Sequence, residues 1–206
     1  EAMGLRSEPP RVVDVDIDLG TGRRLTGTVT PVFGDKLVSV TYSKLDGKHL
    51  LAAWIPLLAL AAHAPGRPWS AVCIGRSKTG TRVRREVIET KEIPAVELLA
   101  DLVAIYDAGR REPIPLPLKT SFAWADARRC GEDPIKEAGH RWRSTDRYPG
   151  DDAQPAHVRA WGDRAPLDEL MQPLRPGEEH PGEGNRLGAF AARVWLPLLQ
   201  AMQGDR

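Results

Sequence analysis

Three acidic residues that could bind a metal ion alternate near the start of the chain. Asp14, Asp16 and Asp18 are separated by Val15 and Ile17, so in a β-strand the three carboxylates would share one face. Carboxylate oxygens are the ligands that Mg²⁺ prefers, and the pattern therefore allows a magnesium site. The same pattern is typical of the solvated face of an edge strand, and like charges at this spacing repel. We favour the solvated face.

The remaining residues that ligate metals or carry out nucleophilic chemistry lack the spacing such sites need. Cys73 and Cys130 do not form a CxxC pair, and the five histidines show neither HxxxH nor HxH spacing. No phosphate-binding glycine loop and no nucleophile elbow is present. We therefore expect no metal and no cofactor, and we expect Cys73, inside an apolar segment, to be a small buried residue.

Basic residues gather in two segments that could contact DNA. The net charge of the chain is only +1, from 29 basic and 28 acidic residues, so any DNA contact must come from a local patch. Basic side chains can hold a DNA backbone, and an aromatic ring among them can stack on a base. The alternative is a solvated surface in which ion pairs with neighbouring acidic residues such as Glu86 and Glu132 neutralise the charge. As residues that contact DNA or a partner we propose Arg76, Lys78, Arg84, Arg128, Arg129, Arg141, Trp142, Arg143 and Trp161.

The first half of the chain predicts a mixed sheet. Strands are expected at residues 12–17, 25–32, 37–42, 69–76 and 82–89. The apolar run at residues 48–63 predicts a buried helix between the third and fourth strands, with the strand after it pairing in parallel. That run is shorter than the roughly 20 residues a bilayer span needs, so we expect no membrane contact and a cytoplasmic protein.

The second half predicts helices joined by long loops. Helices are expected at residues 97–110, 120–129 and 186–202, with an extended proline-rich segment at 114–118. Residues 130–184 are expected to be loop-rich, with short helical pieces at 155–159 and 167–171 and a mobile loop at 178–185.

The tryptophans separate into two groups by the polarity of the sequence around them. Those at positions 54, 69, 124 and 195 lie in apolar surroundings and are expected in the core or as interface anchors. Trp142 and Trp161 lie in polar tracts and are expected to be exposed.

The first helix and the strands before it have the layout of an active site in nucleases of the PD-(D/E)XK type. In that pattern, one carboxylate ends a strand, and the next strand carries a second carboxylate two residues before a lysine. Here Thr30 occupies the first position, and Thr41 and Ser43 occupy the other two. Hydroxyl groups cannot replace two anions around a hard divalent cation. Lys44 lies one residue beyond the lysine position, and on a regular strand its side chain would project from the opposite face.

The order of these segments resembles the C-terminal domain of the exodeoxyribonuclease V gamma subunit (RecC) family. The resemblance rests on LTGTV, LVSVTYSKLDGKHLLAAWIPLLALAA, WSAVCIGR, REPIPLPLKTSFAWA, PAHVRAWGDRAPLDEL and RLGAFAARVWLPLLQAM. It implies a degenerate nuclease-like α/β (α+β) core at residues 11–112, a mixed sheet flanked by helices. A loop-rich helical extension is expected at residues 113–206, and residues 1–10 as a disordered or cloning-derived N-terminus. Members of this family are far longer than 206 residues, so the chain would be a C-terminal piece.

The resemblance also implies a function. It predicts a non-catalytic domain of a helicase–nuclease that processes double-strand DNA ends for recombinational repair, anchors the partner subunits RecB and RecD, and shapes the path of DNA. Residues 128–163 would supply part of the RecD contact or of the DNA path, and the isolated chain is expected to be monomeric. The alternative is a surviving metal-dependent nuclease with a rearranged site that uses Asp14, Asp16, Asp18 or Glu86.

Overall fold

The computed structural model describes residues 8–20, 22–77, 79, 82–91 and 93–203. It forms two compact units, one of residues up to 103 together with residues from 200 onward, and one of residues 104–199. Of the expected disordered segment 1–10, residues 1–7 lie outside the described residues, and 8–10 are exposed and irregular. Lys78 also lies outside the described residues. The predicted domain boundary at residue 112 stays a prediction.

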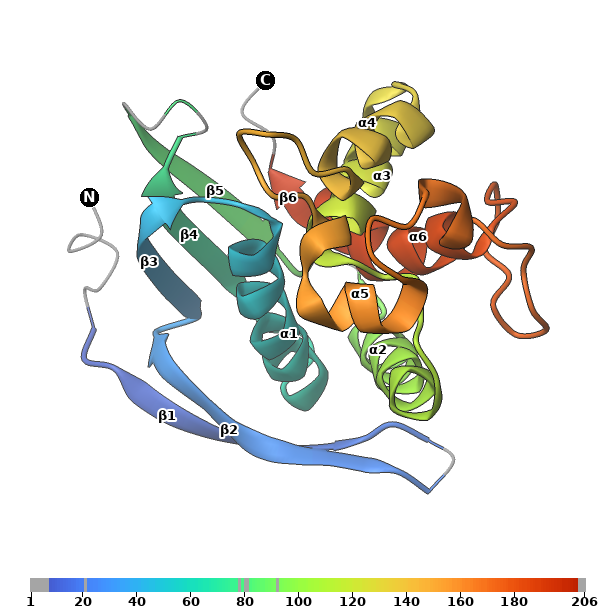
Figure 1. Cartoon of the computed structure of the whole chain (residues 1–206). Helices are drawn as coiled ribbons and strands as arrows, with labels where there is room; N and C mark the ends of the chain where they lie inside the picture. Colours follow the sequence, from blue (N-terminus) through green and yellow to red (C-terminus); the bar gives the residue numbers. More distant parts are fainter. Residues whose placement is uncertain (1–7, 21, 78, 80–81, 92, 204–206) are drawn as a thin grey trace. The chain divides into compact units, whose positions relative to one another are not determined.

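The first unit contains a mixed sheet whose strand order follows the sequence from β1 to β6 (Figure 1). Its strands are β1 (Arg11–Asp18), β2 (Arg24–Phe33), β3 (Lys36–Lys44), β4 (Ser70–Arg76), β5 (Val83–Glu89) and the two-residue β6 (Met202–Gln203). Every neighbouring pair is antiparallel except β3 and β4. A parallel pair needs a crossover connection, and α1 (Gly47–His63) supplies it. The predicted mixed sheet, its buried helix and the parallel strand after that helix are therefore confirmed.

The core of the first unit is apolar. α1 buries Leu50, Trp54, Leu57, Leu58 and Leu60 because it is apolar on almost every side. Strand β4 is central, and residues 71–74 are buried on both of its faces. The expectation of a buried Cys73 is confirmed. Burial raises the pKa of its thiol to about 11, with a further contribution from the charge of Glu86, so the thiol stays protonated at neutral pH.

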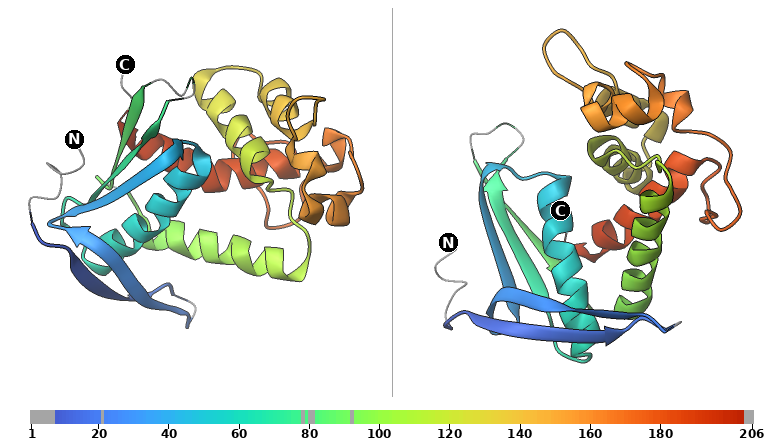
Figure 2. Two further views of the ribbon diagram at one scale, coloured as in Figure 1. Left: turned by 60° about the vertical axis from the view of Figure 1, so that its left-hand side comes forward. Right: turned by 60° about the horizontal axis from the view of Figure 1, so that its bottom comes forward.

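The β1–β2 hairpin diverges from the rest of the sheet. β1 pairs with β2 from Asp18↔Arg24 to Arg11↔Val32, whereas β2 pairs with β3 only at Val32↔Leu37 and Phe33↔Lys36. Figures 1 and 2 show the hairpin leaving the direction of β3, with α1 beside both. β1 is thus an edge strand, and its three aspartates are exposed as predicted.

The second unit is helical. Its elements are the end of α2 (Ala95–Arg111), α3 (Leu118–Cys130), α4 (Pro134–Trp142), α5 (Pro155–Trp161), most of α6 (Arg186–Ala201) and the 3₁₀ turns η1 (Asp151–Ala153) and η2 (Leu167–Glu169). The turn η1 was not predicted, and neither was α4. It begins with a clear local signal, because Asp133 accepts hydrogen bonds from the backbone of Ile135 and Lys136, and Pro134 occupies the first helical position. None of the helices among the described residues is long and apolar enough to cross a membrane.

The four tryptophans that the sequence predicted in the core or at an interface are buried. Trp124 and Trp195 are buried, and Trp195 donates a hydrogen bond to the Ser121 hydroxyl at 2.9 Å. With Trp54 and Trp69, which are also buried, all four tryptophans expected in the core or at an interface are confirmed as buried.

The expectation that Trp142 is exposed is wrong. Its side chain is only 3% exposed, its indole nitrogen donates to the carbonyl of Ala165 at 2.6 Å, and its ring lies 6.2 Å from that of Trp161. The physical reason is that α4 turns Trp142 inward while the charged neighbours Arg141 and Arg143 stay exposed. A polar tract can therefore carry a core residue at its centre.

Candidate nucleic-acid and partner interface

The three positions of the nuclease motif are not joined by strand pairing. Between Val40, paired with Ile74, and Lys44, paired with Arg76, strand β3 has two more residues than β4. The Thr41 hydroxyl accepts a hydrogen bond from the backbone of Ser43 at 3.1 Å inside this bulge. A bulge breaks the alternation that would direct residues 41 and 43 to one face.

Thr30 lies on β2, beyond the point where the ladder with β3 ends. It lines a groove with Ser39, and neither Thr41 nor Ser43 lines that groove. The positions that would hold metal and activate water in a nuclease are therefore dispersed as well as uncharged.

The carboxylates of the alternative nuclease site are also dispersed. Asp14 accepts from the Thr28 hydroxyl at 2.8 Å, and Asp16 forms an ion pair with Arg24 at 2.6 Å. The hydrogen bond from Arg24 lowers the pKa of Asp16. Glu86 lies on β5, separated from β1 by three strands in the sheet order, and pairs with Arg84 at 2.6 Å. Among the described residues there is no group of three or more His, Cys, Asp or Glu placed to hold a metal.

Basic residues from three strands share one face at one end of the sheet. Lys44 of β3 is the direct neighbour of Arg76 of β4, and Arg76 is opposite Val83, two residues before Arg85 on β5. Residues adjacent across strands, and residues two apart along a strand, project from the same face. All three basic side chains are exposed, and none of them forms an ion pair with another described residue. We call Lys44, Arg76 and Arg85 the basic row.

Two of the three members of the basic row, Lys44 and Arg85, were not in the predicted contact set, whereas the predicted Arg84 is not in the row. Arg84 projects from the other face, opposite Gly75, and donates to Glu86 and to the carbonyl of Leu45. It is therefore engaged within the chain. Lys44, by contrast, is a member of the row, although the sequence had suggested only a displaced nuclease lysine there. Its proximity to Arg76 depends on the parallel pairing of β3 and β4, and no local sequence pattern predicts which residues are neighbours in that pairing.

An exposed aromatic residue lies in the bulge next to the basic row. Tyr42 is 96% exposed. Cationic side chains beside an accessible ring are the combination that binds single-stranded nucleic acid, through phosphate contacts and base stacking.

The predicted contact residues of the second unit divide into engaged and unengaged ones. Arg128 donates to Glu183 at 2.8 Å and to the carbonyl of Gly182, and Arg129 pairs with Asp126 at 2.8 Å. Arg141 and Arg143 are exposed, and no ion pair joins either of them to another described residue. Only the latter two arginines keep their charge available for a partner.

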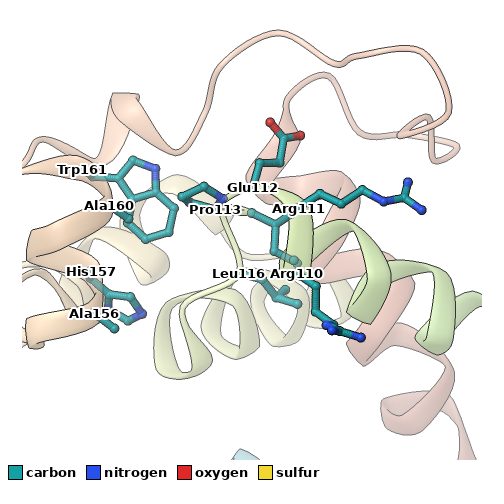
Figure 3. A pocket seen from close by; sticks show the side chains of 11 residues that line it. Arg110, Arg111, Glu112, Pro113, Leu116, Ala156, His157, Ala160 and Trp161 are labelled. Atoms are coloured by element: carbon teal, nitrogen blue, oxygen red, sulfur yellow. The ribbon is translucent and has the colours of Figure 1, made fainter.

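Trp161, half-buried, lines a pocket of about 390 Å³ within the second unit (Figure 3). The end of α2 contributes Arg110 and Arg111, and α5 contributes His157 and Trp161. The Nδ1 atom of His157 lies 2.6 Å from the carbonyl oxygen of Asp151. Because a carbonyl only accepts, Nδ1 carries a proton. The sequence analysis did not predict that Arg110 and Arg111 line a pocket. Their position in the last turn of a helix was the feature of the sequence that could have indicated it.

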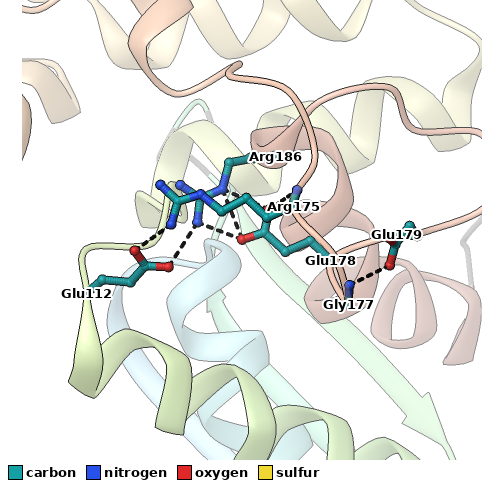
Figure 4. A network of polar contacts seen from close by, with 6 residues as sticks. All are labelled: Glu112, Arg175, Gly177, Glu178, Glu179 and Arg186. Atoms are coloured by element: carbon teal, nitrogen blue, oxygen red, sulfur yellow. Dashed lines mark hydrogen bonds and ion pairs between the residues drawn. The ribbon is translucent and has the colours of Figure 1, made fainter.

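A buried ionic network organises the loop before α6 (Figure 4). Arg186 forms bidentate hydrogen bonds with Glu178, the shortest at 2.6 Å, and lies 3.5 Å from Glu112, which also pairs with Arg175. Burial opposes ionisation of Glu178, but the hydrogen bonds from Arg186 and from the backbone of Arg175 outweigh it and hold the pKa of that carboxyl below its ordinary value. The sequence suggested a mobile loop at residues 178–185. The composition of this segment does not predict the ion pair between Glu178 and Arg186.

Comparisons with known proteins assign a family to this chain. The family model of the RecC C-terminal domain matches residues 2–129. The chain is 69% identical over 201 residues to the RecBCD enzyme subunit RecC of Mycolicibacterium smegmatis, an alignment that covers 98% of this chain and 18% of that protein. It is 62% identical over 188 residues to the subunit of the same name from Mycobacterium tuberculosis strain H37Rv, with 91% and 17% covered. This chain therefore spans less than a fifth of the length of these relatives, and it belongs to the RecC family.

Proposed function

We propose that this chain is a non-catalytic interaction domain of a RecBCD-type helicase–nuclease, one that anchors partner subunits and guides DNA. The observation that carries the proposal is the loss of charge at the motif positions, where Thr30, Thr41 and Ser43 replace two carboxylates and a lysine. In addition, Thr41 and Ser43 lie in a β-bulge and not on a regular strand. The relatives' name supports the role in a complex, and it makes subunits RecB and RecD the proposed partners. A cytoplasmic location follows from the same proposal.

The fold we propose for residues 11–112 is a degenerate PD-(D/E)XK nuclease core. Its support is the succession of antiparallel strands β1–β3, the crossover helix α1 and the parallel strand β4. Residues 113–206 form the proposed C-terminal extension.

The proposed DNA contact is the basic row with Tyr42. Lys44, Arg76 and Arg85 offer three unneutralised cations on one face. Arg141 and Arg143 in the second unit are the proposed partner or DNA contacts there, and Trp161 offers a ring that lines a pocket. We leave Trp142 out of the proposed contacts because its side chain is buried.

A nuclease assay separates this proposal from the alternative of a surviving metal-dependent nuclease. The chain is incubated with linear and single-stranded DNA in Mg²⁺ or Mn²⁺, with EDTA as the control. We expect no cleavage, because a site without its carboxylates cannot hold the metal that lowers the pKa of water. EDTA-sensitive cleavage that is lost in Asp14→Asn or Glu86→Gln would establish the alternative.

A binding assay tests the DNA contact. We expect Arg85→Glu to weaken binding of single-stranded DNA about tenfold at low salt and to reduce the slope of log affinity against log salt by about one. Arg159→Glu is the matched control, since Arg159 is also exposed but lies on α5. Equal effects of the two substitutions would show that net charge, and not the basic row, governs binding.

A further inference from the structure

Strand β2 has a free hydrogen-bonding edge. In the hairpin, the backbone nitrogen of Leu19 donates to the carbonyl of Arg23 at 2.9 Å, whereas that of Asp16 donates at 3.4 Å to the ring of His63 instead of to Thr26. Hydrogen-bonded and non-hydrogen-bonded pairs alternate in an antiparallel ladder. The pairs 18–24, 16–26 and 14–28 are consequently the non-hydrogen-bonded ones. The backbone groups of residues 24, 26 and 28 therefore point away from β1.

No strand among the described residues pairs with these backbone groups. β2 meets β3 only at residues 32 and 33, after which the two strands diverge (Figures 1 and 2). Edge strands are usually protected by charged residues or proline. Arg24, which is paired with Asp16, and Pro31 flank this edge. Residues 25–29 between them are Leu, Thr, Gly, Thr and Val, so the middle of the edge carries neither kind of protection.

A groove lies along this edge. It has a volume of about 430 Å³ and is lined by Leu25, Gly27 and Val29 of β2, Leu37 of β3, and Ala53 and Ile55 of α1. A Cβ atom added to Gly27 would meet no atom within 4 Å, so the groove has unfilled space beside that residue. We call the groove together with residues 24–29 of β2 the fork.

The opposite face of the hairpin is acidic. Asp14, Asp16 and Asp18 are exposed there, and Arg24 neutralises Asp16. A strand added beside β2 would place alternate side chains against α1 and on this face, next to Thr26 and Thr28 and about 10 Å from β1. Long basic side chains can reach Asp14 and Asp18 from there. Charge complementarity therefore favours basic residues at every second position and apolar residues between them.

We propose that the fork binds an extended segment of a partner protein, with alternating apolar and basic residues, which adds to β2 as a further strand. Addition of a strand to an open edge obtains affinity from backbone hydrogen bonds and specificity from alternate side chains. The inference rests on the anchoring role proposed above and assigns that role a surface and a ligand chemistry.

Amide hydrogen exchange followed by NMR tests the edge itself. In the free chain, the amides of residues 25 and 27 are expected to be protected and those of residues 26 and 28 to exchange rapidly. A seven-residue peptide of alternating lysine and valine is the probe, and its binding is expected to protect residues 26 and 28. Protection of these two amides in the free chain would mean that the chain already fills its own fork, and it would overturn the proposal.

Two pairs of variants test the groove and the edge. Gly27→Leu fills the space that a side chain of the probe would occupy, and we expect about tenfold weaker binding. Gly27→Ala, its control, should change the affinity less than about threefold. Thr26→Pro removes one outward N–H, which an edge strand tolerates, and should weaken binding about fivefold to tenfold, whereas Thr26→Ala should not. Melting temperatures check that each variant is folded.

The outcomes distinguish this inference from the proposed function. Absence of saturable binding up to about 1 mM probe, or binding that Gly27→Leu leaves unchanged, overturns the fork as a strand acceptor. Retention of the RecD or RecB subunit by the Gly27→Leu variant in the assembled complex, together with loss of probe binding, would leave anchoring in place through another surface. Probe binding by a chain that retains neither subunit would show the reverse.

Discussion

In the first unit the largest fully buried side chains are apolar, whereas in the second a guanidinium and several carboxylates are buried together with apolar residues. α1 buries Trp54 and four leucines against the sheet. In the second unit Asp151, Asp152, Glu178 and Arg186 are all buried. The first unit is thus stabilised mainly by removing apolar surface from water. The stability of the second unit depends in addition on a few buried polar groups that must keep their hydrogen-bond partners.

The two kinds of core respond differently to substitution. Loss of an apolar side chain leaves a cavity whose cost depends on how far the surroundings relax. Loss of one partner in a buried polar contact leaves the other partner buried without a hydrogen bond or counter-charge. Small movements of the surrounding atoms do not recover the free energy of folding that is lost in this way. Long-range polar contacts should therefore make the second unit the more sensitive to conservative changes.

The largest effect is expected at the apolar core. Trp54→Ala should lower the free energy of unfolding by about 3–5 kcal/mol, as large-to-small aromatic substitutions in cores do. Denaturant unfolding measures the loss, and hydrogen exchange should locate it in residues 11–103. Tyr42→Ala, at an aromatic residue 96% exposed, is the control and should change stability by less than about 0.5 kcal/mol. An unchanged melting temperature for Trp54→Ala would show that α1 is peripheral.

A conservative change in the buried ionic network is expected to cost nearly as much. Glu178→Gln keeps the shape of the side chain but leaves Arg186 without its bidentate partner, and we expect a loss of about 3 kcal/mol in chemical denaturation. Glu179→Gln, next to it and exposed, is the matched control. Similar stabilities for the two variants would remove the distinction between the units.

The cap of α3 offers a smaller and sharper comparison. Asp151 accepts from the backbone nitrogens of Lys119 and Thr120, each at 3.0 Å, and from the Thr120 hydroxyl. It is a cap supplied from about 30 residues away in the sequence. Asp151→Ala should cost about 2 kcal/mol or more, because buried donors lose their acceptor. Asp133→Ala, which removes the local and exposed cap of α4, should cost about 1 kcal/mol.

The pH dependence of stability provides the smallest expected effect. The pKa of Glu178 is lowered in the folded chain from an ordinary value of 4.5. Between the two pKa values the unfolded chain binds more protons, so stability rises with pH there. The contribution is complete above pH 4.5 and is lost as the pH falls through the folded pKa. Comparison of acid unfolding curves should show a shallower loss in Glu178→Gln, and identical curves would contradict this assignment.

The sequence predicted most of the fold because the signals involved are local. The apolar run of α1, the alternation of aspartate with valine and isoleucine in β1, and the burial of four of the six tryptophans follow from periodicity and composition alone. The missed helix α4 also had a local signal in Asp133 and Pro134, which the many charges around it obscured. The family resemblance likewise depends on the order of segments.

The candidate sites were predicted less completely because they depend on pairing between distant residues. Arg84 and Arg85 are neighbours in the sequence, yet one is tied to Glu86 and the other joins the basic row, since adjacent strand residues project from opposite faces.

What the sequence by itself determined is which segments are helical or extended, which positions are apolar, and which motif positions lack charge. Only the tertiary structure decided that β2 leaves β3 after two residue pairs, that Trp142 turns inward, and that Asp151 caps a helix at Thr120, 31 residues upstream. The physical reason is the range of the interactions. Sequence periodicity reflects contacts between residues that are a few positions apart in the chain. A hydrogen bond between distant residues depends instead on the packing of every element that brings them together.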